Sequence, residues 1–367
     1  MSPARAKKPK PTSLDWLTIS QFGLGALGLS LAWMLALFSL IESMLHAVDA
    51  GEQLFSRLGD LVPIASLFVI GLLLLPSTFY ALRRLLGRAS LPAKVPGRLF
   101  GLAILLFPLL LAGGSWAVQA GLGWLALLAH LLAALLLVGW LLWLALRGLR
   151  PGSAQRSWGA FGSGMVASPI LAFSLEAIGL IALILFLAIY IQVNPALSGV
   201  VTSLESATSA NPEVLIQELA PLFNDPLVLL TAFLSLSLFV PVIEELLKPF
   251  AVYLLLRREL SEAQGFALGA LSGAGYALAE NLALNTQPEN LFLVAAGRFG
   301  ASAMHILTAA LSGYALVRAK QQRRIWPFVG ILALNIFIHG LWNGMVLLTT
   351  AAALTQTSGV GLVPEEA

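Results

Sequence analysis

Three charged side chains within five positions interrupt a long apolar run in the C-terminal half of the chain. The stretch reads Pro241-Val-Ile-Glu244-Glu245-Leu-Leu-Lys248-Pro249. A charge at mid-bilayer costs roughly 2.5 to 3.5 kcal/mol on insertion scales, so charges here mark a site rather than a packing surface. Neither proline has an N–H to donate to a carbonyl one turn earlier in a helix. We therefore expect a bend, with carbonyl groups freed beside the charges.

Other ionisable side chains lie at the same expected depth on separate segments. Counted from the cytoplasmic ends at 1.5 Å per residue, Glu244, His305 and His339 are all about 20 Å from the inner surface. On the same count, Glu280 and Asn343 lie about one turn further out. Three helices are thus expected to bring a carboxylate and two imidazoles together.

Two carboxylates, two imidazoles, an asparagine and an arginine in a water-poor site suit one class of reaction. Together they can activate a water molecule and stabilise a tetrahedral oxyanion, as amide hydrolysis requires. Glu244 and Glu245 point about 100° apart on a helix, so one should face the histidines while Lys248 holds the other. The spacing leaves open which carboxylate does which.

Some of these residues also have structural interpretations. Lys248 is favoured as a partner of the glutamate pair over a catalytic amine. Arg298 either reaches the outer interface or belongs to the site, and the sequence does not separate the two. His130, alone among leucines, is expected to be a core or interface histidine.

The composition places the whole chain in the membrane class. Of its 367 residues 58% are hydrophobic and 11% charged, and the mean hydropathy is +0.88, outside the range of soluble domains. The apolar runs are continuous over about 20 to 30 residues, which predicts helices and not an outer-membrane barrel. The chain has no cysteine, which excludes disulfides and thiolate sites.

The apolar runs and the basic residues together predict the topology. All but three of the 21 Lys and Arg residues fall on one side of the membrane if the N-terminus is cytoplasmic. The exceptions are Arg57, expected outside, and Lys248 and Arg298 within spans. The fold class is therefore an all-α polytopic membrane protein with about nine transmembrane helices, N-terminus cytoplasmic and C-terminus outside. Their cores are expected at 19–41, 61–82, 99–120, 124–146, 168–193, 226–256, 263–284, 291–317 and 325–350.

Polarity divides this chain into regions. We expect a basic disordered cytoplasmic tail (1–18), a four-helix membrane region of unknown role (19–166), a catalytic membrane core of helices five to nine (167–352) and a C-terminal tail (353–367). The acidic loop 194–225 is expected outside. No internal repeat is evident, which disfavours inverted-repeat transporters.

Four motifs in the second half resemble those of a known family. They are the EExxK of Glu244 to Lys248, the Gly-x-x-aromatic-x-x-x-Glu-Asn of Gly273 to Asn281, the Arg298…His305…Gly313 segment and the HxxWN of His339 to Asn343. In order and spacing they resemble the PrsW family of intramembrane proteases over about 169–350. Tyr276 stands where Phe is usual. More distantly, the sequence is similar to CAAX prenyl proteases and bacteriocin-processing membrane proteases.

The resemblance implies a multi-pass protease in the plasma membrane of a prokaryote, cutting membrane-embedded or membrane-anchored proteins; the type member acts on an anti-sigma factor. Carried over, Glu244 would be the base with Glu245 as partner, and His339 with Asn343 would stabilise the oxyanion. His305 would orient water or ligate a metal. Lys248, Glu280, Asn281 and Arg298 would support the site.

The resemblance also names a cofactor and partners. A zinc ion would find candidate ligands in His305, His339, Glu245 and Glu280, and the sequence leaves open whether zinc is required. The partners would be a membrane protein or membrane-anchored peptide substrate and the lipid bilayer, with no nucleic acid; the oligomeric state is not predicted.

Two rival functions remain at this point. Glu and His residues inside membranes also form proton relays, so a proton-coupled transporter is one. An inactive family member serving as a binding scaffold is the other. Convergence of polar groups at one depth disfavours the transporter, and chemically competent residues at every motif position disfavour the scaffold.

Overall fold

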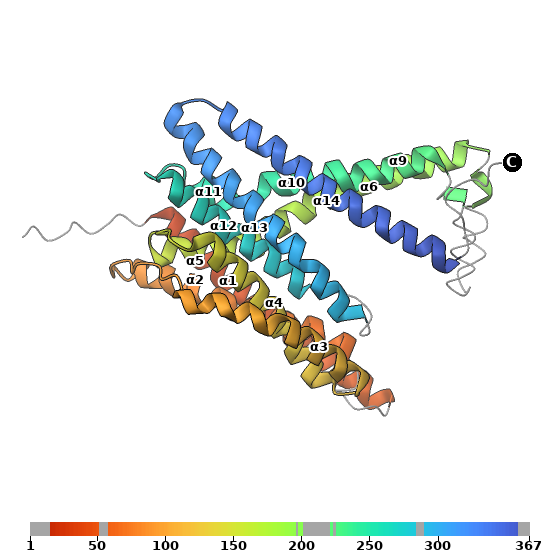
Figure 1. Ribbon diagram of the computed structural model, residues 1–367, viewed down its shortest axis with the longest axis horizontal. Coiled ribbons are helices and arrows are strands. Elements are labelled where there is room, and N and C mark those ends of the chain that lie inside the picture. Colours follow the sequence, from red (N-terminus) through yellow and green to blue (C-terminus); the bar gives the residue numbers. More distant parts are fainter. Residues whose placement is uncertain are drawn as a thin grey trace, which may run out of the picture. The chain divides into compact units, whose positions relative to one another are not determined.

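The computed structural model describes residues 15–50, 58–195, 197–200, 221–222, 225–283 and 290–358. These residues form helices and no named strand (Figure 1). Eight segments within them are long and apolar enough to cross a membrane. The prediction of an all-α polytopic membrane protein is confirmed. The orientation of the termini stays a prediction, and most of the predicted outer loop 194–225 lies outside the described residues.

The seventh apolar run, 263–284, forms a helix that is not among these eight segments. This helix, α12 (Glu262–Leu282), is 21 residues long. Its many glycines, together with Glu280 and Asn281, lower its mean hydropathy below that of the other runs. The same small residues determine how it packs.

The chain divides into two compact units, each made of two sequence ranges. Unit 1 comprises Met1–Pro169 and Lys248–Ile331, and unit 2 comprises Ile170–Leu247 and Leu332–Ala367. One border falls between Leu247 and Lys248, inside the charged stretch. The glutamate pair therefore belongs to unit 2 and the lysine to unit 1.

Unit 1 is a bundle built around α12. Its helices are α1 (Trp16–Ala50), α2 (Leu58–Leu85), the 3-10 helix η2 (Arg98–Leu105), α3 (Leu106–Gln119), α4 (Gly123–Leu146), α5 (Ala154–Gly162), the π-helix η3 (Ser163–Ala167), α11 (Phe250–Leu255), α12 and α13 (Leu291–Gln322). In this unit α12 packs on α13, α5, η3 and α4.

Glycines bring the backbone of α12 against its neighbours. A Cβ on Gly269 would lie 2.2 Å from the carbonyl oxygen of Ala309, and one on Gly273 2.4 Å from that of His305, both on α13. On the opposite side, a Cβ on Gly275 would lie 2.1 Å from the carbonyl oxygen of Phe161. Such close approach is typical of packed membrane helices. The polar residues at the end of α12 are thereby held beside α13.

Unit 2 contains α6 (Ser168–Val193), whose first two residues belong to unit 1, α9 (Pro226–Leu234), the π-helix η4 (Ser235–Phe239), α10 (Val240–Leu247) and most of α14 (Trp326–Ser358). Asp225 caps α9, because its Oδ1 accepts hydrogen bonds from the backbone N–H groups of Leu227 at 2.9 Å and Val228 at 3.0 Å. The Tyr190 hydroxyl donates to the other oxygen of Asp225 at 3.0 Å, which ties α6 to α9.

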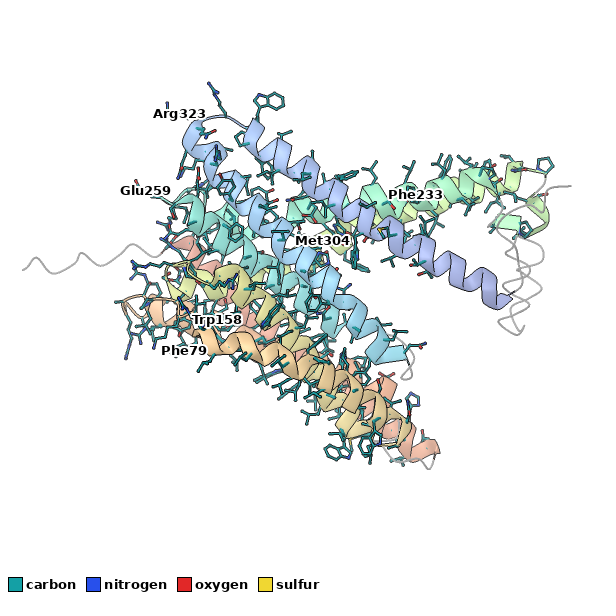
Figure 2. The ribbon with its side chains drawn as sticks, viewed as in Figure 1. Phe79, Trp158, Phe233, Glu259, Met304 and Arg323 are labelled. Atoms are coloured by element: carbon teal, nitrogen blue, oxygen red, sulfur yellow. The ribbon has the colours of Figure 1, made fainter. Side chains whose placement is uncertain are left out.

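Large apolar side chains project from helices in both units. Phe79 on α2 is 57% exposed and Phe233 on α9 is 39% exposed (Figure 2). In a membrane protein such side chains are solvated by lipid tails rather than by water.

Candidate active site

The charged stretch begins just after a π-helical turn in unit 2. In η4 the N–H of Val240 donates to the carbonyl of Ser235, five residues back instead of four. Pro241, the next residue, has no N–H. The Leu236 carbonyl is therefore left without a donor from its own helix, and the Nδ2 of Asn343 on α14 donates to it at 3.0 Å. With regular four-residue spacing Pro241 would free the carbonyl of Ser237; because of the π-turn, the freed carbonyl that the structure shows is that of Leu236, and its bond fixes the amide of Asn343.

A glycine allows α14 to approach this turn closely. A Cβ on Gly340 would lie 2.1 Å from the carbonyl oxygen of Ser237. Any larger residue at position 340 would push the two helices apart. The close approach places His339, the preceding residue, against α10.

His339 lies between the two glutamates. Its Nδ1 and the Oε1 of Glu245 share a hydrogen bond of 3.0 Å, while its Nε2 is 3.8 Å from the Oε2 of Glu244. All three side chains are buried. We expected only one glutamate to face the histidines, but both lie beside His339, because the ring is flat and presents its two nitrogens in different directions.

The two contacts differ in kind. An ionised carboxylate only accepts hydrogen bonds, so an ionised Glu245 assigns the proton to Nδ1 of His339 and leaves a lone pair on Nε2. The 3.8 Å to Glu244 is too long for a direct hydrogen bond and is a separation that one water molecule can bridge. A carboxylate behind an imidazole is also the usual arrangement for a metal-ligating histidine.

A second polar cluster lies in unit 1, between α12 and α13. The Oε2 of Glu280 is 2.8 Å from the Nε2 of His305 and also pairs with Arg298. The Nε of Arg298 donates to the Oδ1 of Asn281 at 2.8 Å, and the Nδ2 of Asn281 donates to the Oγ of Ser302 at 3.0 Å. These contacts place Arg298 in the polar cluster of unit 1, and its role in a catalytic site stays a prediction.

The helix is interrupted within the charged stretch, and Lys248, at this interruption, contacts other residues of unit 1. As expected from Pro249, the helix is interrupted: α10 ends at Leu247 and α11 begins at Phe250. The N–H of Val252 donates to the carbonyl of Pro249 at 2.8 Å, and the Oγ of Ser272 donates to the carbonyl of Lys248 at 2.5 Å. The Lys248 ammonium lies 5.3 Å from the centre of the Tyr276 ring, a cation–π distance.

Each unit thus gathers part of the residues expected in the site. Unit 2 holds Glu244, Glu245, His339 and Asn343, and unit 1 holds Lys248, Glu280, Asn281, Arg298 and His305. The alignment in depth of His305 with Glu244 and His339 stays a prediction. Our sequence interpretation assigned no polar role to Ser272 or to Ser302, although Ser302 stands four residues after Arg298 and so on the same helix face.

Comparison with known families decides the class of protein. The PrsW family of intramembrane metalloproteases matches residues 157–364, more than half of the chain. The chain belongs to the PrsW family. Its membership confirms the resemblance seen in the four motifs and supports a peptidase that acts in a membrane.

All the site residues expected from the sequence fall within the range matched by the PrsW family, whereas α1 to α4 precede it. No curated protein and no solved structure matches the chain. The description of PrsW proteins as metalloproteases agrees with the environment of His339, whose Nε2 can serve as a ligand while Glu245 holds Nδ1.

Proposed function

We propose that this protein is an intramembrane endopeptidase that hydrolyses membrane-embedded or membrane-anchored proteins with a water molecule activated by Glu244. The observation that carries the proposal is His339 held between Glu244 and Glu245 in a chain of the PrsW family. A water that bridges Glu244 and the Nε2 of His339 would lie within reach of a base, as general base catalysis requires.

The reaction needs one proton acceptor and one site for the developing charge. Glu244 takes a proton from water as the water oxygen bonds to the peptide carbonyl carbon, which gives a tetrahedral oxyanion. One N–H of Asn343 is used by the Leu236 carbonyl, and its second N–H is the donor we assign to the oxyanion. The C–N bond then breaks, and Glu244 returns the proton to the leaving amine.

The residues present also fit a zinc ion. His339 of unit 2 would be a ligand through Nε2, and His305 and Glu280 of unit 1 stay candidates from the sequence alone. Glu245, a candidate ligand from the sequence, is proposed instead as the carboxylate that orients His339. When bound, zinc would polarise the substrate carbonyl and lower the pKa of water.

In unit 1, we propose that Glu280 and Arg298 hold His305 in a fixed orientation for the same reaction. Arg298 neutralises Glu280, and Glu280 accepts from His305. The proposed substrate in the prokaryotic plasma membrane is a single-pass anti-sigma factor, whose cleavage would release a sigma factor.

Cleavage of membrane proteins in cells tests the proposal. Membranes from cells expressing the wild type, Glu244→Gln or His339→Ala are compared for new protein N-termini. We expect wild-type-dependent termini within or beside membrane segments, reduced on the order of 10² to 10⁴-fold in either variant. Glu42→Gln, which removes an exposed carboxylate on α1, is the matched control and should cleave normally.

Two results would contradict the proposal. Unchanged cleavage in both site variants, at equal expression, would refute the site assignment. Proton-coupled solute uptake by the purified protein in liposomes, without proteolysis, would favour the transporter instead.

A further inference from the structure

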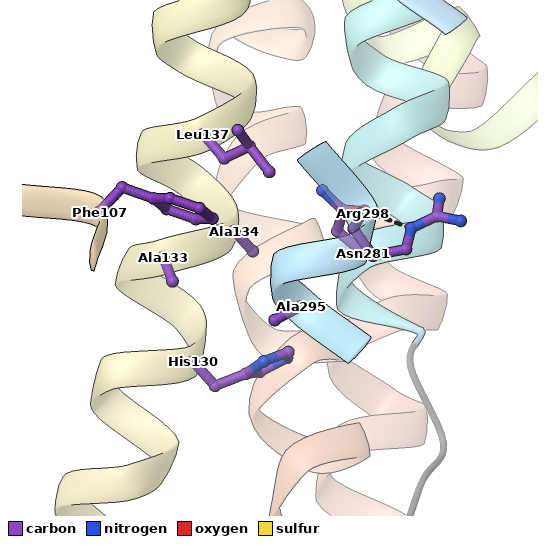
Figure 3. A pocket seen from close by; sticks show the side chains of 8 residues that line it. All are labelled: Phe107, His130, Ala133, Ala134, Leu137, Asn281, Ala295 and Arg298. Carbon is purple, nitrogen blue, oxygen red and sulfur yellow. Dashed lines mark hydrogen bonds between the residues drawn. The ribbon is translucent and has the colours of Figure 1, made fainter. Parts of the chain in front are cut away.

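Cavities in unit 1 differ in what they can hold. The cavity shown in Figure 3, with Phe107, His130 and Ala295 in its wall, offers about 10 Å³ to the centre of a water molecule. Roughly 10 to 15 Å³ is needed for one water by that measure, so no larger ligand fits there. Another cavity, beside the last turns of α13, offers about 210 Å³ by the same measure. This larger cavity has room for a small ligand or for part of a lipid headgroup.

The larger cavity lies between the last turns of α13 and the segment that joins α11 to α12. Its apolar wall is formed by Leu256, Leu260 and Val317. Its polar wall is formed by two basic side chains, one amide and one carboxylate: Arg258, Lys320, Gln321 and Glu259. A ligand that fits this wall has an acceptor for the basic groups and an apolar part beside it.

Two donors of this wall are held in place by backbone carbonyls. The Nζ of Lys320 donates to the carbonyl of Leu256 and, at 3.0 Å, to that of Arg258. The Nε2 of Gln321 donates to the carbonyl of Leu260 at 3.0 Å. An ammonium has three N–H donors and an amide two, so each group keeps one N–H beyond these contacts. Because the side chains are already fixed, a ligand would not have to order them.

Positive charge dominates this end of unit 1. Arg258 pairs with Asp15, which precedes α1. With Asp15, the segments 257–262 and 318–324 hold six basic and three acidic residues, a net charge of +3. The basic residues are Arg257, Arg258, Arg318, Lys320, Arg323 and Arg324, and the acidic ones are Asp15, Glu259 and Glu262. The excess favours an anion as the ligand of the cavity.

Two apolar side chains follow directly after α13. Ile325 is 57% exposed and Trp326, the first residue of α14, is 74% exposed. Tryptophan is enriched where a membrane meets water. The distribution of Lys and Arg predicts that this end of the bundle is cytoplasmic, and basic pockets between helices on that side suit lipid headgroups.

We propose that this cavity binds the phosphate headgroup of an anionic phospholipid, with Lys320 and Gln321 donating to the phosphate. Ile325 and Trp326 would contact the acyl chains. A lipid bound here would join the segment before α12 to the end of α13, the two helices that carry the polar cluster. The assignment of this ligand does not depend on the proposed peptidase activity.

Binding of phosphatidylglycerol to the full-length protein in detergent tests the proposal, with native mass spectrometry measuring the bound fraction. We expect the wild type to retain phosphatidylglycerol over phosphatidylcholine. Lys320→Gln should raise the dissociation constant about fivefold, the contribution of one basic residue beside an anionic lipid. Glu259→Gln should lower it severalfold, because it removes the carboxylate from the wall.

Arg88→Gln is the matched control. Arg88 is exposed beyond α2 on the same predicted side and does not line the cavity. Its loss of one positive charge should leave the dissociation constant within about twofold of the wild type. An equal rise in Arg88→Gln and Lys320→Gln would overturn the proposal, since it would show attraction by overall charge alone.

Further outcomes separate the alternatives. Unchanged affinity in Lys320→Gln would overturn the site. Displacement of phosphatidylglycerol by soluble glycerol phosphate at equal phosphate concentration would overturn the assignment to a lipid. Phosphatidylglycerol should also raise the melting temperature of the wild type more than that of Lys320→Gln, because a ligand of the folded state stabilises it. Unfolding cannot imitate the tighter binding expected for Glu259→Gln, because an unfolded variant loses the site.

Discussion

At the scale of single residues, the neighbours of His339 give the two adjacent glutamates different tasks. Glu245 hydrogen-bonds Nδ1, and Glu244 lies 3.8 Å from Nε2. From the sequence alone, the side chains of Glu244 and Glu245 were expected to point about 100° apart, which does not assign a role to either one. From these contact distances we propose that Glu245 orients His339 and that Glu244 lies closest to a bound water or ion.

Removing the orienting carboxylate should weaken metal binding. Glu245→Ala leaves Nδ1 of His339 without its acceptor, and loss of such a partner typically costs 10- to 100-fold in metal affinity. We expect the zinc dissociation constant, measured by competition with a chelator, to rise by about that factor. Glu245→Gln, whose carbonyl oxygen can still accept, should show a smaller rise. Equal zinc affinity in all three proteins would refute the orienting role.

The Glu280 and Arg298 pair should show non-additive effects on stability. Arg298→Met leaves Glu280 without its cation, and Glu280→Gln leaves Arg298 without its anion. Each single change should cost about 1 to 3 kcal/mol, seen as a lower melting temperature in detergent. The double variant removes both charges, so it should lose less than the sum of the singles. Strict additivity would show that the two groups do not interact.

At the scale of helices, the prolines and the π-turn explain how polar groups are oriented in an apolar medium. In η4 the displaced Val240 bond and Pro241 together free the Leu236 carbonyl, and Asn343 satisfies it. Near Pro249, the carbonyl of Lys248 is satisfied by Ser272. In both places a side chain from another helix replaces a backbone donor. An irregular backbone inside a membrane protein is tolerated under that condition.

Two glycines of α14 offer a matched comparison for this packing. Gly340→Ala would place a Cβ 2.1 Å from the Ser237 carbonyl, whereas Gly330→Ala would meet nothing within 4 Å. We expect Gly340→Ala to destabilise by about 1 to 3 kcal/mol through overpacking and to lose cleavage as His339 moves. Gly330→Ala should be neutral or stabilise by about 0.4 to 1 kcal/mol. Similar melting temperatures and activities for the two variants would contradict the close approach of α14 to η4.

At the scale of the whole molecule, the range matched by the family does not coincide with a compact unit. Unit 1 combines the N-terminal helices with α11 to α13, and α12 packs on α2 and α4 as well as on α5 and α13. Four of the residues in the polar cluster, Glu280, Asn281, Arg298 and His305, therefore lie on helices whose packing depends on segments before residue 157.

Deleting the first 156 residues should therefore disrupt the polar cluster even though every motif is retained. Residues 157–367 expressed alone are expected to aggregate or to be degraded, because the faces of α12 and α13 that pack on α4 would be exposed. Co-expression of residues 1–156 as a separate chain should restore protein level and cleavage. The measurement is the amount of monodisperse protein in detergent. A stable, active 157–367 fragment would show that the N-terminal helices are dispensable.

The sequence by itself determined the class and the family, and it singled out the residues that we propose carry the chemistry. Charges at Glu244, Glu245 and Lys248 are costly in an apolar run, so their presence is informative without a structure. The length and continuity of the apolar runs likewise predicted the helices, because lipid requires every backbone group to be bonded within its own segment. The four motifs then identified the PrsW family, since their order and spacing can be read directly from the sequence.

Only the tertiary structure decided which partner each residue has. Glu280 pairs with Arg298 and His305 across two helices, and Asn343 serves a carbonyl 107 positions earlier. The border between units inside the charged stretch is equally absent from local patterns. The physical reason is that such contacts depend on how closely helices approach and how each is rotated. Both follow from the packing of glycines and alanines along whole helices, which spacing within one segment does not encode.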